Sequence, residues 1–218
     1  MKHVLMFDFD GVIADSLDLF SDTFIAACRT HDFGQVRSRA AFLRLFDVNL
    51  YDGMAAAGIP RRAFTKVLGT MSAALPAPAR RGRFFPGMPA ALRRLAAAHR
   101  VVVITSNHSA TVAAALRARK VTGIAAVLGW DVARSKVRKI RRVMRAHPGG
   151  AYYYIGDTRG DLIEGRAAGA RTVAVTWGWH TEARLQKARP DYIVRSPTAL
   201  VALFAGAGPA RARKGKVP

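Results

Sequence analysis

Short apolar segments alternate with segments of helical periodicity over most of the chain. The apolar segments have the length and composition of strands that are buried on both faces of a parallel sheet. They span residues 4–7, 101–104, 125–128, 152–155, 172–175 and 192–194. Between them, apolar residues recur at helical spacing over 89–99, 109–119 and 136–145. Strands that alternate with helices predict an α/β fold whose core is a Rossmann-like parallel sheet.

The segment after the first strand departs from this alternation. Residues 16–75 show helical patterns and no strand pattern, and Leu17, Phe20 and Phe24 share the spacing of one helical face. A Pro- and Arg-rich connector follows at 76–83. We therefore predict a small inserted α-helical domain at residues 16–82 and a core domain made of residues 1–15 and 83–218.

Polar residues follow four of the predicted strands. In open α/β sheets the ligand lies outside the carboxyl ends of the strands, so these side chains are expected to gather at one site. They are Asp8 and Asp10 after the first strand, Thr105, Ser106 and Asn107 after the second, Lys136 in the helix after the third, and Asp157 and Asp161 after the fourth.

Each group taken alone has a simpler explanation. Asp8 and Asp10 also fit an Asp-Gly turn with solvated carboxylates. Lys136 also fits a solvated basic helix face, which would include Arg138, Lys139, Arg141 and Arg142. The recurrence of polar groups at one end of one sheet is harder to attribute to loop composition, and it favours a functional site.

The combination suits phosphoryl transfer. Asp8, Asp157 and Asp161 offer the carboxylate oxygens that Mg²⁺ prefers. Thr105, Ser106 and Asn107, with nearby backbone N–H groups, can hold phosphate oxygens, and Lys136 adds a point charge for the same group.

These motifs resemble those of the haloacid dehalogenase superfamily, and in particular its phosphatases with a helical cap domain between the first two motifs. The matching segments are Asp8-Phe9-Asp10-Gly11-Val12, Thr105 after its strand, Lys136, and Gly156-Asp157-Thr158-Arg159-Gly160-Asp161. Residues 177–180 and 190–193 resemble the C-terminal part of phosphoglycolate phosphatases.

The resemblance implies a mechanism. Asp8 would be the nucleophile that forms an aspartyl phosphate. Asp10 would be the general acid and base, and its backbone carbonyl a metal ligand beside Asp8 and Asp157. Asp161 would either bind the metal as well or support the residues that bind it. An Asp at position 10 favours phosphatase or phosphomutase chemistry over dehalogenation. The expected cofactor is Mg²⁺ and the expected substrate a small phosphorylated metabolite, similar to phosphoglycolate.

Two other functions stay open at this point. A hexose phosphomutase would use the same two aspartates, and would yield an isomerised sugar phosphate instead of inorganic phosphate. A nucleic-acid-binding protein on a hydrolase scaffold would explain the strongly basic composition of the chain.

Within the cap, the candidate cations for contacting substrate are Arg44, Arg61, Arg62 and Lys66.

The chain is strongly basic. It has 35 Lys and Arg against 14 Asp and Glu, a formal net charge of +21. Residues 53–130 contain 12 of the basic residues and no acidic one. Because no nucleic-acid recognition motif accompanies the charge, we interpret it as a solvated surface that binds nucleic acid weakly and without sequence preference. The single cysteine, Cys28, rules out a disulfide framework, and no signal peptide or membrane segment is evident. We expect a cytoplasmic protein that does not bind membranes; its oligomeric state is open.

Overall fold

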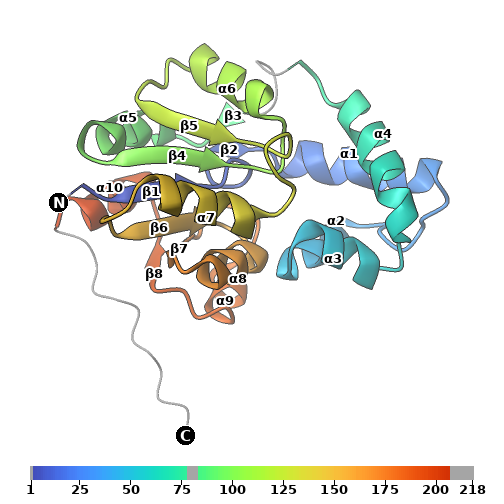
Figure 1. Cartoon of the computed structure of the whole chain (residues 1–218). Helices are drawn as coiled ribbons and strands as arrows, with labels where there is room; N and C mark the ends of the chain where they lie inside the picture. Colours follow the sequence, from blue (N-terminus) through green and yellow to red (C-terminus); the bar gives the residue numbers. More distant parts are fainter. Residues whose placement is uncertain (1, 78–82, 207–218) are drawn as a thin grey trace, which may run out of the picture.

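A parallel sheet forms the centre of the molecule (Figure 1). The computed structural model describes residues 2–77 and 83–206. Within them, six strands pair in the order β5-β4-β1-β6-β7-β8, and all five pairings are parallel. The strands are β1 (Val4–Phe7), β4 (Arg100–Ile104), β5 (Ile124–Leu128), β6 (Tyr152–Gly156), β7 (Arg171–Val175) and β8 (Tyr192–Val194). Each lies within one residue of an apolar segment of the sequence, and the predicted α/β fold is confirmed.

The register of the central strands sets the position of the loops that follow them. Phe7 of β1 pairs with Val103 of β4 on one side and with Ile155 of β6 on the other. The three strands therefore end almost level, and the loops after β1, β4 and β6 begin side by side.

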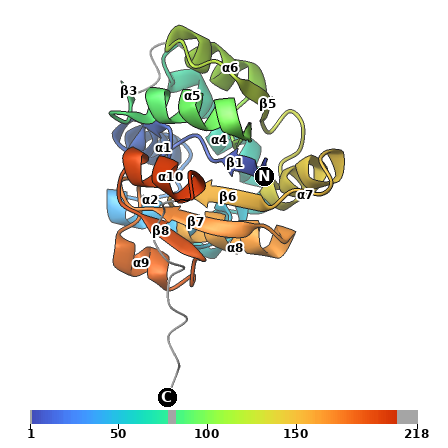
Figure 2. The same cartoon turned by 90° about the vertical axis from the view of Figure 1, so that its left-hand side faces the viewer.

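Helices cover both faces of the sheet (Figure 2). Successive side chains of a strand point to opposite faces, so Leu5 and Phe7 pack on one side of β1 while Val4 and Met6 pack on the other. The first side holds α5 (Met88–Ala98), α6 (Ser109–Ala118) and α10 (Pro197–Phe204); the second holds α7 (Lys136–Ala146) and α8 (Arg159–Ala168), with α9 (Glu182–Gln186) beside α8. In the described part of the chain, no helix combines the length and the apolar character needed to span a membrane.

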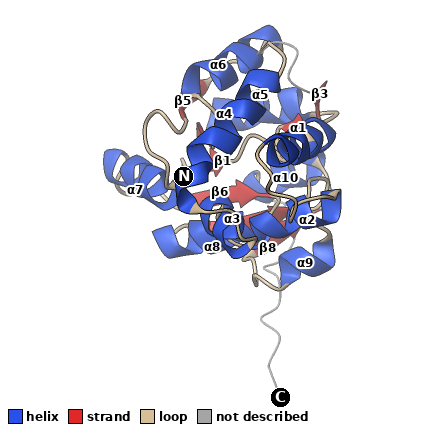
Figure 3. Ribbon diagram, turned by 90° about the vertical axis from the view of Figure 1, so that its right-hand side faces the viewer, coloured by secondary structure: helices blue, strands red, loops and turns tan. Residues whose placement is uncertain are grey.

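The segment after β1 forms a helical layer beyond the carboxyl ends of the strands (Figures 1 and 3). Its elements are α1 (Leu17–Thr30), α2 (Arg39–Arg44), the 3-10 turn η1 (Leu45–Asp47), α3 (Leu50–Ala56), the 3-10 turn η2 (Arg61–Ala63) and α4 (Phe64–Ala74). The layer has a hydrophobic cluster of its own, built around Phe24, Phe42, Met54 and Val67. The expected helical character is confirmed for its described residues; the Arg-rich part of the predicted connector, at 78–82, lies outside them.

A small antiparallel pair closes the base of this layer. Strand β2 (Ala14–Asp15) pairs with β3 (Arg83–Phe84), so that the two ends of the helical segment lie next to each other. The sequence does not reveal this pair, because two residues per strand are too few to show a period.

Candidate active site

The loop after β1 brings its two aspartates to the edge of the sheet. The backbone N–H of Asp8 still donates to the Ile155 carbonyl (2.9 Å), which extends the β1–β6 ladder by one residue. The chain then turns sharply at Gly11, whose φ is +75° and whose N–H donates to the Ala14 carbonyl (2.8 Å). A Cβ on Gly11 would lie 1.9 Å from Asp157 Oδ2. Glycine is thus required here both for the backbone conformation and for the close approach of Asp157.

Three carboxylates from two loops and one helix meet at this edge. Asp8, Asp157 and Asp161 are buried, and each offers an oxygen within 4.8 Å of the others'. The Lys136 ammonium donates to Asp8 Oδ2 (2.7 Å) and to Asp161 Oδ1 (2.6 Å). The structure therefore brings together four of the residues singled out in the sequence.

The cluster sets three acidic side chains against one lysine. Burial raises the pKa of Asp8 to about 7, with Lys136 opposing the shift and Asp161 adding to it. Burial, and then the charges of Asp161 and Asp8, raise the pKa of Asp157 well above its usual range. Although burial opposes it, the two partner carboxylates Asp161 and Asp8 raise the pKa of Lys136, so this side chain stays charged. A divalent cation would relieve the remaining repulsion.

The two carboxylates of the fourth motif differ in how far their oxygens are used. Asp157 Oδ2 accepts from the Trp179 N–H (2.7 Å), but its buried Oδ1 has no hydrogen-bond partner. Asp161 Oδ1 accepts from Lys136, and its Oδ2 accepts from the N–H (3.2 Å) and hydroxyl (2.6 Å) of Thr158. A buried, unpaired carboxylate oxygen beside other carboxylates fits a hard cation such as Mg²⁺. Asp157 Oδ1 is thus available to bind a metal, whereas both oxygens of Asp161 accept hydrogen bonds, from Lys136 and from Thr158 at the start of α8.

Asp10 lies apart from this cluster. Its Oδ1 accepts from the Ser16 hydroxyl (2.8 Å), and its Oδ2 accepts from the Asn107 side-chain amide. Its half-buried side chain lines a cavity between the sheet and the helical layer. The carboxyl is therefore held by two donors at the place where a bound molecule would enter.

The expected phosphate-binding residues fall into two groups. Ser106, Asn107 and Lys136 line the cavity. Thr105 is fully buried below them, where its hydroxyl accepts from the Asn107 N–H (3.0 Å). In this structure Thr105 shapes the loop after β4, and its direct contact with phosphate stays a prediction.

Lys139 corrects one interpretation of the sequence. The sequence pattern puts it on a solvated basic face, yet it is fully buried and its ammonium donates to the Thr105 carbonyl. Burial, together with the charge of Lys136, lowers its pKa to about 8. The helical spacing offered a sign of this burial, because position 139 lies next to buried Ile140 and one turn after Lys136. Lys139 ties α7 to the loop that carries Ser106 and Asn107.

This buried lysine should make stability depend on pH. Its folded pKa of about 8 lies below the ordinary value of 10.5, so between these values the unfolded chain binds more protons and stability rises with pH. Denaturant unfolding at pH 7 and 9.5 should show wild type gaining about 2 kcal/mol relative to Lys139→Met. Arg138→Met, at an exposed neighbour, is the control and should show no such change. A pH-independent difference for Lys139→Met would contradict the prediction.

A family model of haloacid dehalogenase-like hydrolases matches residues 5–175, from β1 to the end of β7. The chain belongs to this family. The hydrolase is 26% identical over 215 residues to a phosphoglycolate phosphatase of Synechococcus elongatus, with 91% of this chain and 95% of the relative covered. It is 29% identical over 206 residues to a protein of Dickeya dadantii named probable phosphatase IndB, covering 89% and 90%. Among solved structures, a predicted phosphatase from Clostridium acetobutylicum shares the fold with a TM-score of 0.81 at 21% identity, covering 94% of this chain and 99% of that one.

The helical layer is fixed to the core of the hydrolase by the segment after β7. His180 is buried; its Nδ1 accepts from the Arg159 N–H (3.0 Å) and its Nε2 faces the Leu43 carbonyl (3.0 Å). Arg184 of α9 forms a bidentate ion pair with Asp47 of η1, in which two guanidinium nitrogens donate to the two carboxylate oxygens (2.8 and 2.7 Å). The sequence does not reveal this buried bridge between the two units, because its partners lie far apart along the chain.

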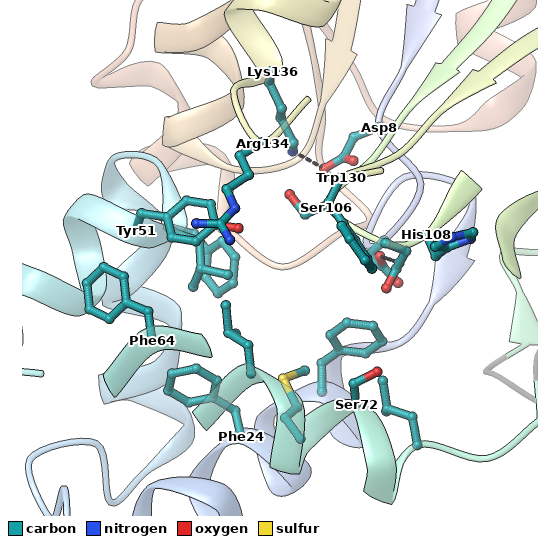
Figure 4. A pocket seen from close by; sticks show the side chains of 18 of the residues that line it. Asp8, Phe24, Tyr51, Phe64, Ser72, Ser106, His108, Trp130, Arg134 and Lys136 are labelled. Carbon is teal, nitrogen blue, oxygen red and sulfur yellow. Dashed lines mark hydrogen bonds and ion pairs between the residues drawn. The ribbon is translucent and has the colours of Figure 1, made fainter. Parts of the chain in front are cut away.

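The cavity between the two units measures about 560 Å³ and extends from Asp8 and Lys136 to α4 (Figure 4). About a third of the residues that line it are Phe, Tyr or Trp: Phe20, Phe24, Phe42, Phe46, Tyr51, Phe64, Trp130 and Trp179. The candidate cations Arg44, Arg61, Arg62 and Lys66 do not line it. Arg61 instead pairs with Asp52 at the surface (3.2 Å).

Proposed function

We propose that this hydrolase is a Mg²⁺-dependent phosphatase that cleaves a small phosphate monoester through an aspartyl-phosphate intermediate on Asp8. The observation that carries the proposal is the position of Asp8. It lies in a buried carboxylate cluster, bonded to Lys136, at the end of a cavity large enough for a substrate. The names of the two relatives, a phosphoglycolate phosphatase and a probable phosphatase, support the same chemistry.

The chemistry proceeds in two displacements. A carboxylate oxygen of Asp8 attacks phosphorus, the ester P–O bond breaks, and the leaving alkoxide takes a proton from Asp10. A water that gives its proton back to Asp10 then attacks phosphorus of the acyl phosphate, which releases inorganic phosphate and restores Asp8. Lys136 places a positive charge beside Asp8, and Ser106 and Asn107 supply hydrogen-bond donors at the same end of the cavity.

A bound metal would supply the remaining positive charge. Asp8 and Asp157 would hold it with the Asp10 carbonyl, and Mg²⁺ there would neutralise the repulsion between Asp8 and the phosphate dianion. We propose that Asp161 orients Lys136 and does not coordinate the metal, since both of its carboxylate oxygens already accept hydrogen bonds.

Residues 16–82 are proposed to form the cap domain of this phosphatase, with the core at 1–15 and 83–218. In the described structure the cluster around Asp8 comes from the core, whereas most of the cavity wall facing it comes from the helical layer. This division separates the residues that react from those that contact the alcohol part of the substrate.

The functional test is release of inorganic phosphate from a panel of phosphorylated metabolites with Mg²⁺. Turnover that stops with a chelator and returns with Mg²⁺ is the expected result. Isomerised sugar phosphate without released phosphate would indicate a mutase, and an absence of turnover across the panel would overturn the proposal.

Matched substitutions should separate the two aspartates of the fourth motif. Asp157→Asn removes a ligand, and the Mg²⁺ concentration for half-maximal activity should rise by more than about tenfold. Asp161→Asn weakens the hold on Lys136, so it should lower kcat/KM while leaving the Mg²⁺ requirement in place. The thermal shift caused by Mg²⁺ gives a second readout, which Asp157→Asn should reduce and Asp161→Asn should keep. Equal shifts of the Mg²⁺ requirement in both variants would contradict the assignment.

A further inference from the structure

We infer that the ester cleaved at this site carries an aromatic ring on its alcohol, in place of the second acidic group that phosphoglycolate carries. The inference rests on the proposed phosphatase function and names its substrate class. It is drawn from the cavity wall that faces Asp8.

That wall is rich in aromatic rings, of which Phe20, Phe46 and Tyr51 are partly exposed, while Phe24 and Phe42 belong to the buried cluster of the helical layer. Trp179 contacts Phe46 and Phe42, with ring centroids 4.8 and 5.5 Å apart, and Phe42 contacts Phe24 at 5.5 Å. A second pair, Tyr51 and Phe64, has its centroids 6.0 Å apart. Figure 4 shows Phe24 and Phe64 across the cavity from Asp8 and Lys136. Such a surface gains free energy by covering an apolar ring and offers little to a small polar molecule.

The wall is also uncharged. Every described residue that the helical layer contributes to the cavity is neutral. A substrate carboxylate against these rings would find no cation in the helical layer, which is costly. Arg134 of the core also lines the cavity, but its guanidinium lies over the Tyr51 ring. The substrate carboxylate would also approach a phosphate site that already holds Asp8, Asp10 and Asp161.

Two residues of the loop between β5 and α7 complete the ring site. Trp130 lines the cavity and is 51% exposed; the His108 ring contacts its ring with centroids 5.3 Å apart, and the rest of the ring surface is open to a ligand. Its backbone N–H donates to the Asn107 carbonyl (3.0 Å), which places it next to the proposed phosphate site. The Arg134 guanidinium lies over the Tyr51 ring, 6.0 Å from its centroid. Planar groups that already stack in this way can extend their stack to a ligand ring.

Matched esters test the inference on the full chain with Mg²⁺. 2-Phenylethyl phosphate is compared with ethyl phosphate, and adenosine 5′-monophosphate with ribose 5-phosphate. Each pair shares a primary alcohol and differs by a ring, so the ratio of kcat/KM within a pair reports recognition of the ring. We expect the ring-bearing member to be favoured on the order of 10- to 100-fold, from the burial of one aromatic group. The pair with the larger ratio tells whether the ring is a hydrocarbon or a nucleobase.

Substitutions locate the effect. Trp130→Ala should lower the ratio within a pair by roughly tenfold, the value of one stacking contact, and Trp130→Phe should restore most of it. Val48→Ala, at an apolar side chain that is 38% exposed and outside the cavity lining, should leave the ratio unchanged.

Binding without turnover separates this inference from the proposed function. Calorimetry should show 2-phenylethylphosphonate binding more tightly than ethylphosphonate, by the same order as the esters. If no ester releases phosphate but the phosphonates differ in this way, the phosphatase proposal fails and the ring site stands. Equal values within the pairs, or 2-phosphoglycolate turned over better than 2-phenylethyl phosphate, would overturn the inference while leaving phosphatase chemistry in place.

Discussion

Asp8→Asn is expected to lower kcat by about 10⁴-fold or more, the size of effect that follows the removal of a catalytic nucleophile. A neutral amide is a poor nucleophile and a weaker ligand for Mg²⁺. The neighbouring acids cannot replace it, because Asp161 accepts hydrogen bonds from Lys136 and Thr158, and Asp10 accepts them from Ser16 and Asn107. The measurement is phosphate release at saturating Mg²⁺, combined with mass spectrometry of a trapped phosphoryl or beryllofluoride adduct.

The stability of this variant shows whether the loss is chemical. Burial raises the pKa of Asp8 to about 7 from an ordinary value of 3.8, so the ionised carboxylate costs stability as pH rises through that range. At neutral pH and without metal, Asp8→Asn should therefore unfold at no lower denaturant concentration than wild type. An adduct on another residue, or an active Asp8→Asn enzyme, would refute the mechanism.

Asp10→Asn is expected to slow the enzyme by roughly 10²–10⁴-fold on alkyl esters, the usual value of general acid–base catalysis. The loop should keep its shape, because the new amide oxygen can accept from Asn107 while its NH₂ donates to the Ser16 hydroxyl, which also accepts. What is lost is the proton for the leaving group and the base for water.

The two steps should respond differently to the leaving group. With p-nitrophenyl phosphate the first step needs little protonation, so Asp10→Asn should show a burst of nitrophenol followed by slow turnover as the phosphoenzyme accumulates. Ser16→Ala, which removes one donor and keeps the carboxyl, is the control and should show a much smaller loss and no burst. Equal losses on alkyl and aryl esters, without a burst, would argue against Asp10 as the acid and base.

The sequence alone determined the alternation of strands and helices in the core and the order of the motifs along it, whereas the order of the strands within the sheet came from the structure. Apolar strands and amphipathic helices leave a local periodic signal, since each must bury one face or both. Asp8, Asp157 and Lys136 could be expected at one place, because the carboxyl ends of neighbouring parallel strands share one edge of the sheet.

Only the tertiary structure decided which partners each side chain of the site has. The burial of Lys139, the full engagement of Asp161 and the unpaired oxygen of Asp157 depend on side chains from other elements meeting in space. The aromatic cavity combines residues of α1, α2, α4 and the loop after β5, and those on the helices each have the spacing of an ordinary core position. A local pattern records that a side chain is covered, but whether its cover is a neighbouring helix or a bound substrate is set by contacts between segments distant in the chain.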